Sequence, residues 1–112
     1  MKYGNKKTKV DDIAFDSKRE ADRWLDLRLL ERAGRITGLR RQVAFELAPA
    51  IKFDGAARTK PALRYFADFE YFENGARIVE DVKSVATAKK EAFVIKRHLM
   101  KHLHGIDVRI TT

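Results

Sequence analysis

Two aspartates and a lysine stand on either side of a turn signal in the segment Leu63–Lys83. The signal is Asn74-Gly75, a pair suited to a two-residue type I′ turn because both positions take positive φ angles. If this pair forms the turn, the register of the two flanking strands places Asp68 opposite Asp81. Facing side chains share one side of a sheet with Cβ atoms about 4.5 to 5.5 Å apart, so the two carboxylates are predicted to converge.

Strand alternation decides which neighbouring side chains join this pair. Lys83 is two residues beyond Asp81 and shares its face, whereas Glu80 points to the other side with Ile78 and Val82. Two carboxylates repel each other, and a hard divalent cation such as Mg²⁺ relieves that repulsion through oxygen ligands and water. The backbone carbonyl of Val82 is a candidate further ligand. The alternative is a partly solvated ion cluster on an exposed sheet face, and a one-residue slip of the register would separate the aspartates.

A third acid, Glu20, has two explanations. It ends the capping-box sequence Ser17-Lys18-Arg19-Glu20, so its carboxylate could bond the backbone amide of Ser17. On a helical wheel it also lies between Trp24 and Leu27, two residues expected to face the interior. That position aims the carboxylate toward the sheet, where it could reach the same metal. The sequence does not decide whether Glu20 caps the helix or binds the metal.

The elements that must position these residues follow from local patterns. A first helix is expected over Ser17–Ala33, because Gly34 stands at a C-terminal capping position. Strands are expected over Arg35–Leu47, Leu63–Phe72 and Arg77–Lys83, a second helix over Thr87–His104 with a stripe of Ala88, Ala92, Ile95, Leu99 and Leu103, and a last strand over Ile106–Ile110. Residues 48–61 read as a basic connection with a short irregular strand around Ile51–Phe53. The order predicts a mixed α+β (α/β) fold with a mixed central sheet flanked by helices.

Composition bounds the organisation of the chain. Its 112 residues suit one domain, which we place at 15–112 after a basic N-terminal arm at 1–14. There are 24 Lys and Arg against 16 Asp and Glu, and a net charge of +8 on so small a domain favours nucleic acid as the partner. The absence of cysteine excludes disulfides and thiolate zinc sites. No signal peptide or bilayer-spanning stretch is apparent, so we expect a cytoplasmic protein without a membrane partner.

Cations that could contact phosphate fall in three regions: the arm, the sheet segment and the second helix. They are Lys6 and Lys7; Arg40, Arg41 and Lys60; and Lys89, Lys90, Lys96 and Arg97, with Lys2, Lys9, Arg58, Arg64 and Lys101 as extensions. The alternative for the arm and the helix is an ordinary solvated charged surface. Because no base-reading motif accompanies these cations, recognition of nucleic-acid shape is expected rather than of sequence. His98 and His102 have a zinc-binding spacing but no evident third ligand.

Taken in order, these segments resemble the PD-(D/E)XK nuclease superfamily. The resemblance rests on Glu20 in an N-terminal helix, Asp68 in "RYFADF", and Asp81-Val82-Lys83 in "VEDVKS", followed by a basic helix and a short strand. More closely, "FDSKREADRWLDL", "AGRITGLRRQVAFEL", "YFADFEYF" and "EDVKS" are similar to a family of small phage-encoded nucleases of the Holliday junction resolvase type. The likeness runs from about Phe15 to Lys101, with Ala67 where the first motif element has Pro.

The resemblance implies a restriction-endonuclease-like core of helix, three strands, helix and strand. It also implies a metal-dependent, structure-selective DNA endonuclease, most closely a phage Holliday junction resolvase acting on four-way junctions in DNA recombination or repair. In that scheme Glu20, Asp68 and Asp81 hold Mg²⁺, with Mn²⁺ as a substitute. Lys83 orients the attacking water and stabilises charge on the scissile phosphate.

A resolvase cuts two opposed strands and therefore needs two active sites, which predicts a homodimer. Leu29 and Leu30 extend the apolar surface of the first helix beyond its expected core stripe, so they are candidates for a symmetric contact or for burial beneath the arm. Two alternatives to a resolvase remain: another nuclease of the same fold, such as a nickase or flap-type enzyme, and a basic DNA-binding module whose acids are not catalytic.

Overall fold

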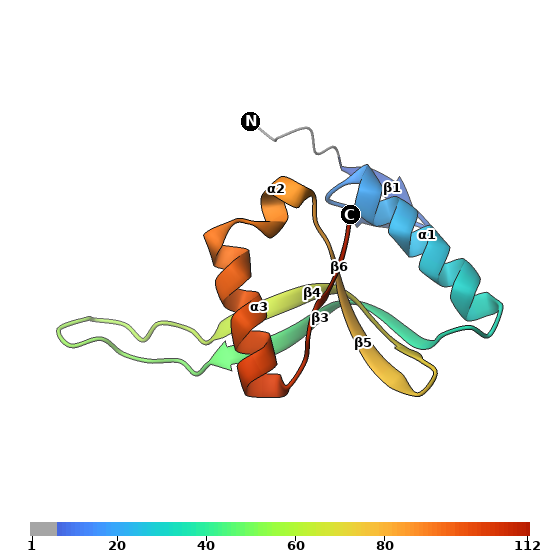
Figure 1. The fold of residues 1–112 in the computed structure, drawn as a ribbon. Coiled ribbons are helices and arrows are strands. Elements are labelled where there is room, and N and C mark those ends of the chain that lie inside the picture. Colours follow the sequence, from blue (N-terminus) through green and yellow to red (C-terminus); the bar gives the residue numbers. More distant parts are fainter. Residues whose placement is uncertain (1–6) are drawn as a thin grey trace.

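A four-stranded mixed sheet forms the centre of the computed structural model, which describes residues 7–112 (Figure 1). In spatial order its strands are β3 (Thr37–Ala48), β4 (Leu63–Glu73), β5 (Ala76–Val82) and β6 (Arg109–Thr111). The first three pair antiparallel and β6 lies parallel to β5. Helices α1 (Lys18–Arg32) and α3 (Glu91–His104) pack against this sheet on either side of β6 in the view of Figure 1. The predicted mixed α+β class and element order are confirmed, with added elements described below.

Helix α1 begins and ends close to where the sequence indicates. The Ser17 side chain caps its first turn by accepting a hydrogen bond from the Glu20 amide at 3.1 Å. The helix ends at Arg32, and Gly34 follows the C-cap with a φ of 77°. A positive φ at this position is inexpensive for glycine alone, because it has no Cβ. Both boundaries therefore follow from local capping chemistry.

A small antiparallel hairpin precedes α1, formed by β1 (Thr8–Val10) and β2 (Ile13–Phe15). Its turn residues Asp11 and Asp12 have φ angles of 52° and 63°, and Asp is one of the few residues that tolerate this conformation. Phe15 is buried in the core beneath α1. The expected arm at 1–14 contained only one short strand. The structure instead packs the described part of that segment against the domain, because its apolar residues can cover one side of α1.

Two apolar clusters fill the space between sheet and helices. One gathers around α1 and contains Phe15, Ala21, Trp24, Leu27, Ile36, Phe69 and Tyr71. The other gathers around α3 and contains Phe45, Tyr65, Ala67, Val79, Phe93, Met100 and Val108. Each helix is therefore held by its own set of buried side chains, and the acids singled out from the sequence lie where the two sets meet.

Side-chain alternation changes phase in the middle of β3 and β4. In β4, Phe69 belongs to the α1 cluster, whereas Ala67, two residues away, belongs to the α3 cluster. Regular alternation would place both on one face. Gln42 of β3, which stands across from Asp68, has a φ of 52°. A non-glycine residue in this conformation interrupts the pleat, so the two strands present core residues to α1 before this point and to α3 after it.

The predicted second helix is two helices. A single turn, α2 (Val85–Ala88), is capped by Ser84, whose Oγ accepts a hydrogen bond from the Thr87 amide at 3.1 Å. The helix is interrupted at residues 89–90, and α3 begins after them. The expectation of one continuous helix over Thr87–His104 was wrong, because a competing Ser cap starts a separate turn upstream and extended backbone at Lys90 precedes α3.

The apolar stripe expected on this helix was also wrong. Phe93 and Met100 are the buried residues of α3, with Leu99 partly buried, whereas Ile95 and Leu103 are exposed. Apolar residues lie on more than one side of this helix, so helical periodicity alone does not decide which side packs against the sheet. The bulkier pair, one aromatic and one Met seven residues apart, occupies the side against the sheet.

Between β3 and β4 the chain forms a long projection, residues 49–62, which we call the finger. Ile51 and Lys60 form one isolated bridge within it, with hydrogen bonds of 3.1 and 2.6 Å in the two directions. Figure 1 shows the finger continuing the direction of β3 and β4 past α3. It helps to explain why the molecule measures 54 × 38 × 27 Å. The predicted basic connection with a short irregular strand thus takes the form of a protruding ribbon.

Candidate functional site

The hairpin of β4 and β5 has the register that the sequence predicts. Asn74 and Gly75 form its turn with φ angles of 52° and 79°, the positive pair that a type I′ turn requires. Cross-strand partners run from Glu73 and Ala76 to Phe69 and Glu80 without a shift. The ladder ends at that last pair, and Asp68 and Asp81 are the next residue on each strand.

The two aspartates are tied together through the backbone. The Asp68 amide donates to Asp81 Oδ1 at 3.1 Å, and the Val82 amide donates to Asp68 Oδ2 at 2.9 Å. The Asp81 residue is 1% exposed, and Asp68 is partly buried. Both carboxylates are therefore fixed at one place between the strands, with low access to bulk water, and the predicted convergence of the pair is confirmed.

Lys83 supplies the cation next to this pair. Its Nζ lies 3.0 Å from Asp81 Oδ2 and 4.9 Å from the ring centre of Phe93 in α3. Asp81 Oδ2 is buried and makes no hydrogen bond within residues 7–112, so the contact with Lys83 is an ion pair without hydrogen-bond alignment. This oxygen thus has unused capacity to accept a hydrogen bond or to coordinate a cation.

Glu20 approaches the site from α1. Ser17 forms its half of the capping box, but the Glu20 carboxylate is buried and its Oε2 lies 3.9 Å from the Arg41 guanidinium. Burial raises the pKa of Glu20, as do the charges of Asp16 and Asp81, against the opposing effect of Arg41. The inward direction inferred from the helical wheel is confirmed. The role of Glu20 as a metal ligand stays a prediction.

Negative charge at this site exceeds what the surrounding protein neutralises. Burial, followed by the charge and hydrogen bonding of Asp81 and the charge of Glu20, raises the pKa of Asp68 to about 8. Burial and then the charge of Asp81 also raise the pKa of Tyr65, whose hydroxyl is buried without a hydrogen-bond partner in the described structure. Carboxylates held close together in a poorly solvated place bind protons for the reason that they would bind a metal: each added positive charge relieves their repulsion.

The side chains at this place supply only some of the ligands that Mg²⁺ needs, so water or substrate would have to supply the rest. Across the described residues, no group of three or more His, Cys, Asp or Glu side chains is arranged so that it could hold a metal ion. Asp68 and Asp81 nevertheless provide two carboxylates, and Mg²⁺ is commonly bound by one or two carboxylates together with waters and substrate phosphates. The contact that Val82 makes here is through its amide, so its carbonyl as a ligand stays a prediction.

Glu80, the acid next to Asp81 in sequence, has a different environment. It is 0% exposed and accepts hydrogen bonds from Arg23 Nε at 2.6 Å, Arg23 Nη2 at 3.0 Å and the Tyr71 hydroxyl at 2.6 Å. Burial acts to raise its pKa, but these bonds and the Arg23 charge outweigh burial and lower it. Glu80 therefore fastens β5 to α1. Arg23 was not among the predicted site residues, and only its position one turn after Glu20 in α1 pointed to it.

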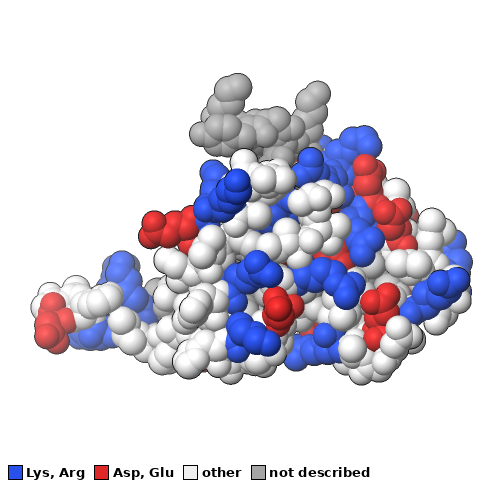
Figure 2. All heavy atoms as spheres, in the orientation of Figure 1, with Lys and Arg blue, Asp and Glu red and all other residues white. Residues whose placement is uncertain are grey.

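The predicted phosphate-binding cations differ in their exposure and in the acids or rings that they contact. Arg40 is paired with Glu70 and Arg97 lies 3.3 Å from Asp107, whereas Arg41 is mostly buried against the Phe15 ring. Arg40 and Arg97 are nevertheless exposed, as are Lys7, Lys60, Lys89, Lys90 and Lys96, and Lys6 lies outside the described residues. Figure 2 shows Lys and Arg over much of one face, with Asp and Glu among them, and on the projecting finger. The assignment of these cations to DNA stays a prediction.

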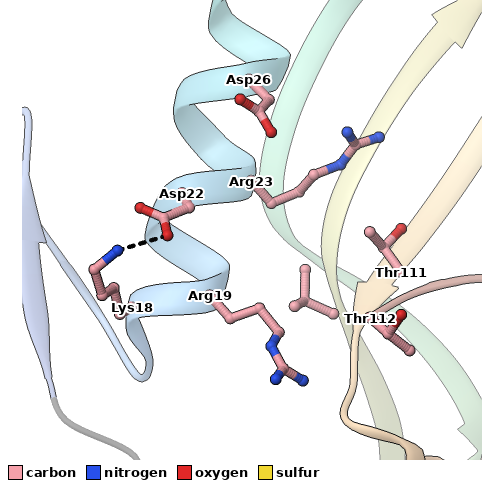
Figure 3. Close-up of a pocket in the computed structure, with 8 residues that line it drawn as sticks. Lys18, Arg19, Asp22, Arg23, Asp26, Thr111 and Thr112 are labelled. Carbon is pink, nitrogen blue, oxygen red and sulfur yellow. Dashed lines mark hydrogen bonds and ion pairs between the residues drawn. The ribbon is translucent and has the colours of Figure 1, made fainter.

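A hollow of about 450 Å³ lies between α1 and the ends of β5 and β6 (Figure 3). It is lined by Lys18, Arg19, Asp22, Arg23, Asp26, Val82, Thr111 and Thr112. Lys18 and Asp22 form an ion pair of 2.9 Å across one helical turn. Val82 separates this hollow from the acid pair, since its amide bonds Asp68. The lining mixes both signs of charge, so it does not by itself indicate an anion site.

Three other expectations can be placed. His98 and His102 are exposed, and in the described chain neither belongs to a group that could hold a metal. Leu30 packs on the α1 cluster, whereas Leu29 is 60% exposed, so a dimer contact there stays a prediction. Among residues 7–112, no helix is long and apolar enough to cross a bilayer.

Comparison with known proteins identifies a family. Residues 1–111 match the family described as "Protein of unknown function (DUF1064)". The match covers nearly the whole chain, so the protein belongs to this family. No curated protein and no solved structure matches the chain.

Proposed function

We propose that this member of the DUF1064 family is a metal-dependent endonuclease that hydrolyses phosphodiester bonds in branched DNA, with the four-way Holliday junction as substrate. The observation that carries the proposal is the pair Asp68 and Asp81, held together between two strands beside Lys83. The resemblance of the motif segments to PD-(D/E)XK nucleases supports the same activity. Net charge of +8 favours a polyanionic substrate.

The chemistry fits the groups present. Asp68 and Asp81 would hold Mg²⁺ or Mn²⁺, with Glu20 close enough for its charge to act on both. A divalent ion at such a site polarises a phosphoryl oxygen and lowers the pKa of a bound water. Lys83 places its ammonium at the acid pair and rests on the Phe93 ring, which limits its movement. From there it can donate hydrogen bonds to a scissile phosphate or to the attacking water.

The exposed cations would recognise the shape of the DNA rather than its base sequence. Cations at exposed positions contact phosphates, and phosphate contacts set position and affinity but carry no sequence information. A resolvase that cuts opposed strands would act as a homodimer. Nickase or flap-type activity on the same fold is the nearest alternative within this proposal.

Cleavage assays test the proposal directly. Labelled four-way junction, linear duplex and single strands are incubated with the protein in Mg²⁺, Mn²⁺ or EDTA. We expect metal-dependent nicks placed symmetrically at the junction. Asp81→Asn should abolish cleavage and leave binding in EDTA largely intact. The matched control is the adjacent acid: Glu80→Gln should cut within a few-fold of wild type at a temperature where circular dichroism shows it folded, because Glu80 bonds Arg23 and not the acid pair.

The outcomes separate the alternatives. Cuts in linear duplex or in single strands would support another nuclease of the same fold. Junction binding without cutting in either metal would leave a basic DNA-binding module, and the acid pair would then have no catalytic role. Equal loss of activity in Asp81→Asn and Glu80→Gln would contradict the assignment of the two acids to different environments.

A further inference from the structure

The finger has a surface that the acid site does not account for. Its turn is closed by a hydrogen bond of 3.0 Å from the Ala56 amide to the Phe53 carbonyl, with Gly55 at a φ of 78°. Phe53 stands at this turn with 58% of its surface exposed, and Ile51 behind it is 47% exposed. Large apolar side chains that are exposed at the end of a projection commonly mark a contact site.

The same segment is positively charged. Residues 49–62 contain Lys52, Arg58 and Lys60 against a single acid, Asp54. In the described structure none of the three cationic side chains forms an ion pair. Arg40, Arg77 and Arg97, by comparison, each pair with an acid, so the three finger cations keep their charge available for a partner.

We infer that the finger is a second DNA-contacting element, in which the three cations contact phosphates and Phe53 packs on bases. The inference rests on the proposed function for the nature of the substrate. Aromatic side chains stack on bases and apolar wedges enter distorted steps, whereas Lys and Arg follow the backbone. This combination of an apolar tip and basic flanks favours nucleic acid over a second copy of the chain, which would bring like charges together.

Geometry sets where this contact falls. The chain from Ala56 to Asp68 passes down one side of the finger into β4, and its length at about 3.3 Å per residue sets an upper limit of about 40 Å. One turn of B-DNA is about 34 Å long. The tip of the finger therefore lies at most about one helical turn from the acid pair, where the proposed function places the scissile phosphate. A branched substrate with long arms offers DNA at that distance, and a substrate with arms of a few base pairs does not.

Binding measurements with arms of different length test the inference. The full chain is titrated in EDTA, so that nothing is cut, with four-way junctions of about 6 or about 20 base pairs per arm. We expect a variant with Lys52→Gln, Arg58→Gln and Lys60→Gln to bind the long-arm junction about 10- to 100-fold more weakly. Its salt dependence should fall by about 2 to 3 in slope, since each phosphate contact contributes about 0.9. Phe53→Ala should weaken long-arm binding about 5- to 150-fold, the effect of losing a base stack.

Both variants should bind the short-arm junction within about twofold of wild type, because the finger then has no DNA to contact. Matched controls lie on α1: Arg32→Gln for an exposed cation and Leu25→Ala for an exposed apolar side chain. Neither control should change affinity for either junction. Because these measurements need no cleavage, they stand or fall separately from the nuclease assay.

Four results would overturn the inference. Equal losses on short and long arms would mean that the finger does not reach distant DNA. No loss on either substrate would mean that it does not bind DNA. A change in sedimentation mass on Phe53→Ala, with DNA affinity unchanged, would make the tip a contact between copies. Weaker binding of Phe53→Ala to phosphatidylserine vesicles, again with DNA affinity unchanged, would assign the finger to lipid surfaces.

Discussion

Replacing Asp68 by Asn should stabilise the metal-free protein while abolishing any metal-dependent activity. Two carboxylates about 5 Å apart repel each other by about 3 kcal/mol at an effective dielectric constant near 20. Lys83 and the backbone amides at the site offset part of this repulsion, which leaves a gain of about 1 to 2 kcal/mol. An Asn oxygen can still accept the hydrogen bond from the Val82 amide. The midpoint of thermal unfolding should therefore rise by about 4 to 10 °C.

The gain should depend on pH in a defined direction. The pKa of Asp68 is raised to about 8 in the folded protein, from about 3.9 in an unfolded chain. Between these values the folded state binds a proton that the unfolded state lacks, so the free energy of unfolding of wild type falls as pH rises. Asn cannot titrate. The advantage of Asp68→Asn should therefore be small near pH 4, grow with pH, and level off above about pH 8.

Thermal and urea unfolding, both followed by the fluorescence of buried Trp24, are the assays, in EDTA and in Mg²⁺. Asp107→Asn is the matched control, because this exposed acid only pairs with Arg97 and should show little change. Added Mg²⁺ should stabilise wild type and have less effect on Asp68→Asn, since a ligand that binds only the folded state raises its stability. If Asp68→Asn is destabilising throughout the pH range, the two carboxylates do not repel in the folded protein and the case for a metal between them fails.

Two further substitutions follow from other contacts. Glu80→Gln should lower the free energy of unfolding by about 2 to 3 kcal/mol, because it removes a buried charge bonded to Arg23, whereas Glu73→Gln, at a half-exposed pair, should cost under about 0.5. Since the folded pKa of Glu80 is lowered, this difference should shrink in urea titrations as pH falls below about 4. Gly38→Ala should cost about 1 to 2 kcal/mol more than Gly34→Ala: both have positive φ, but only at Gly38 would a Cβ lie 3.2 Å from the Phe72 ring. Equal costs at the two glycines would show that the ring moves aside freely.

Local chemistry made the hairpin register predictable. Asn74-Gly75 allows one tight turn, and that turn sets the strand partners as far as Phe69 and Glu80, which brings the next residues, Asp68 and Asp81, within reach of each other. The same holds for α1, whose ends are set by Ser17 and Gly34. In each case a short stretch of residues determines the geometry without help from distant parts of the chain.

Tertiary packing decided what the sequence left open. The facing of α3 depends on which of two apolar sides meets the sheet, and Phe93 and Met100 occupy it because they fill the space beside Val79 and Val108. Arg23 could not be paired with Glu80 from spacing, since the contact joins α1 to β5 across 57 positions. The early hairpin likewise depends on a partner, the side of α1 that it covers.

The phase change at Gln42 and Asp68 explains why a site forms at this place in the sheet. A regular β4 would present all of its inward residues to one helix. With the interruption, α3 packs on the part of β4 before Asp68 and α1 packs on the part after it, so Asp68 lies at the boundary between the two parts. Glu20 then approaches from α1, and Lys83 approaches over the Phe93 ring of α3. Gln42 also donates to Asp68 Oδ1 at 3.4 Å. A residue that restores normal alternation at position 42 would therefore disturb the acid site through the backbone, without removing any charged group.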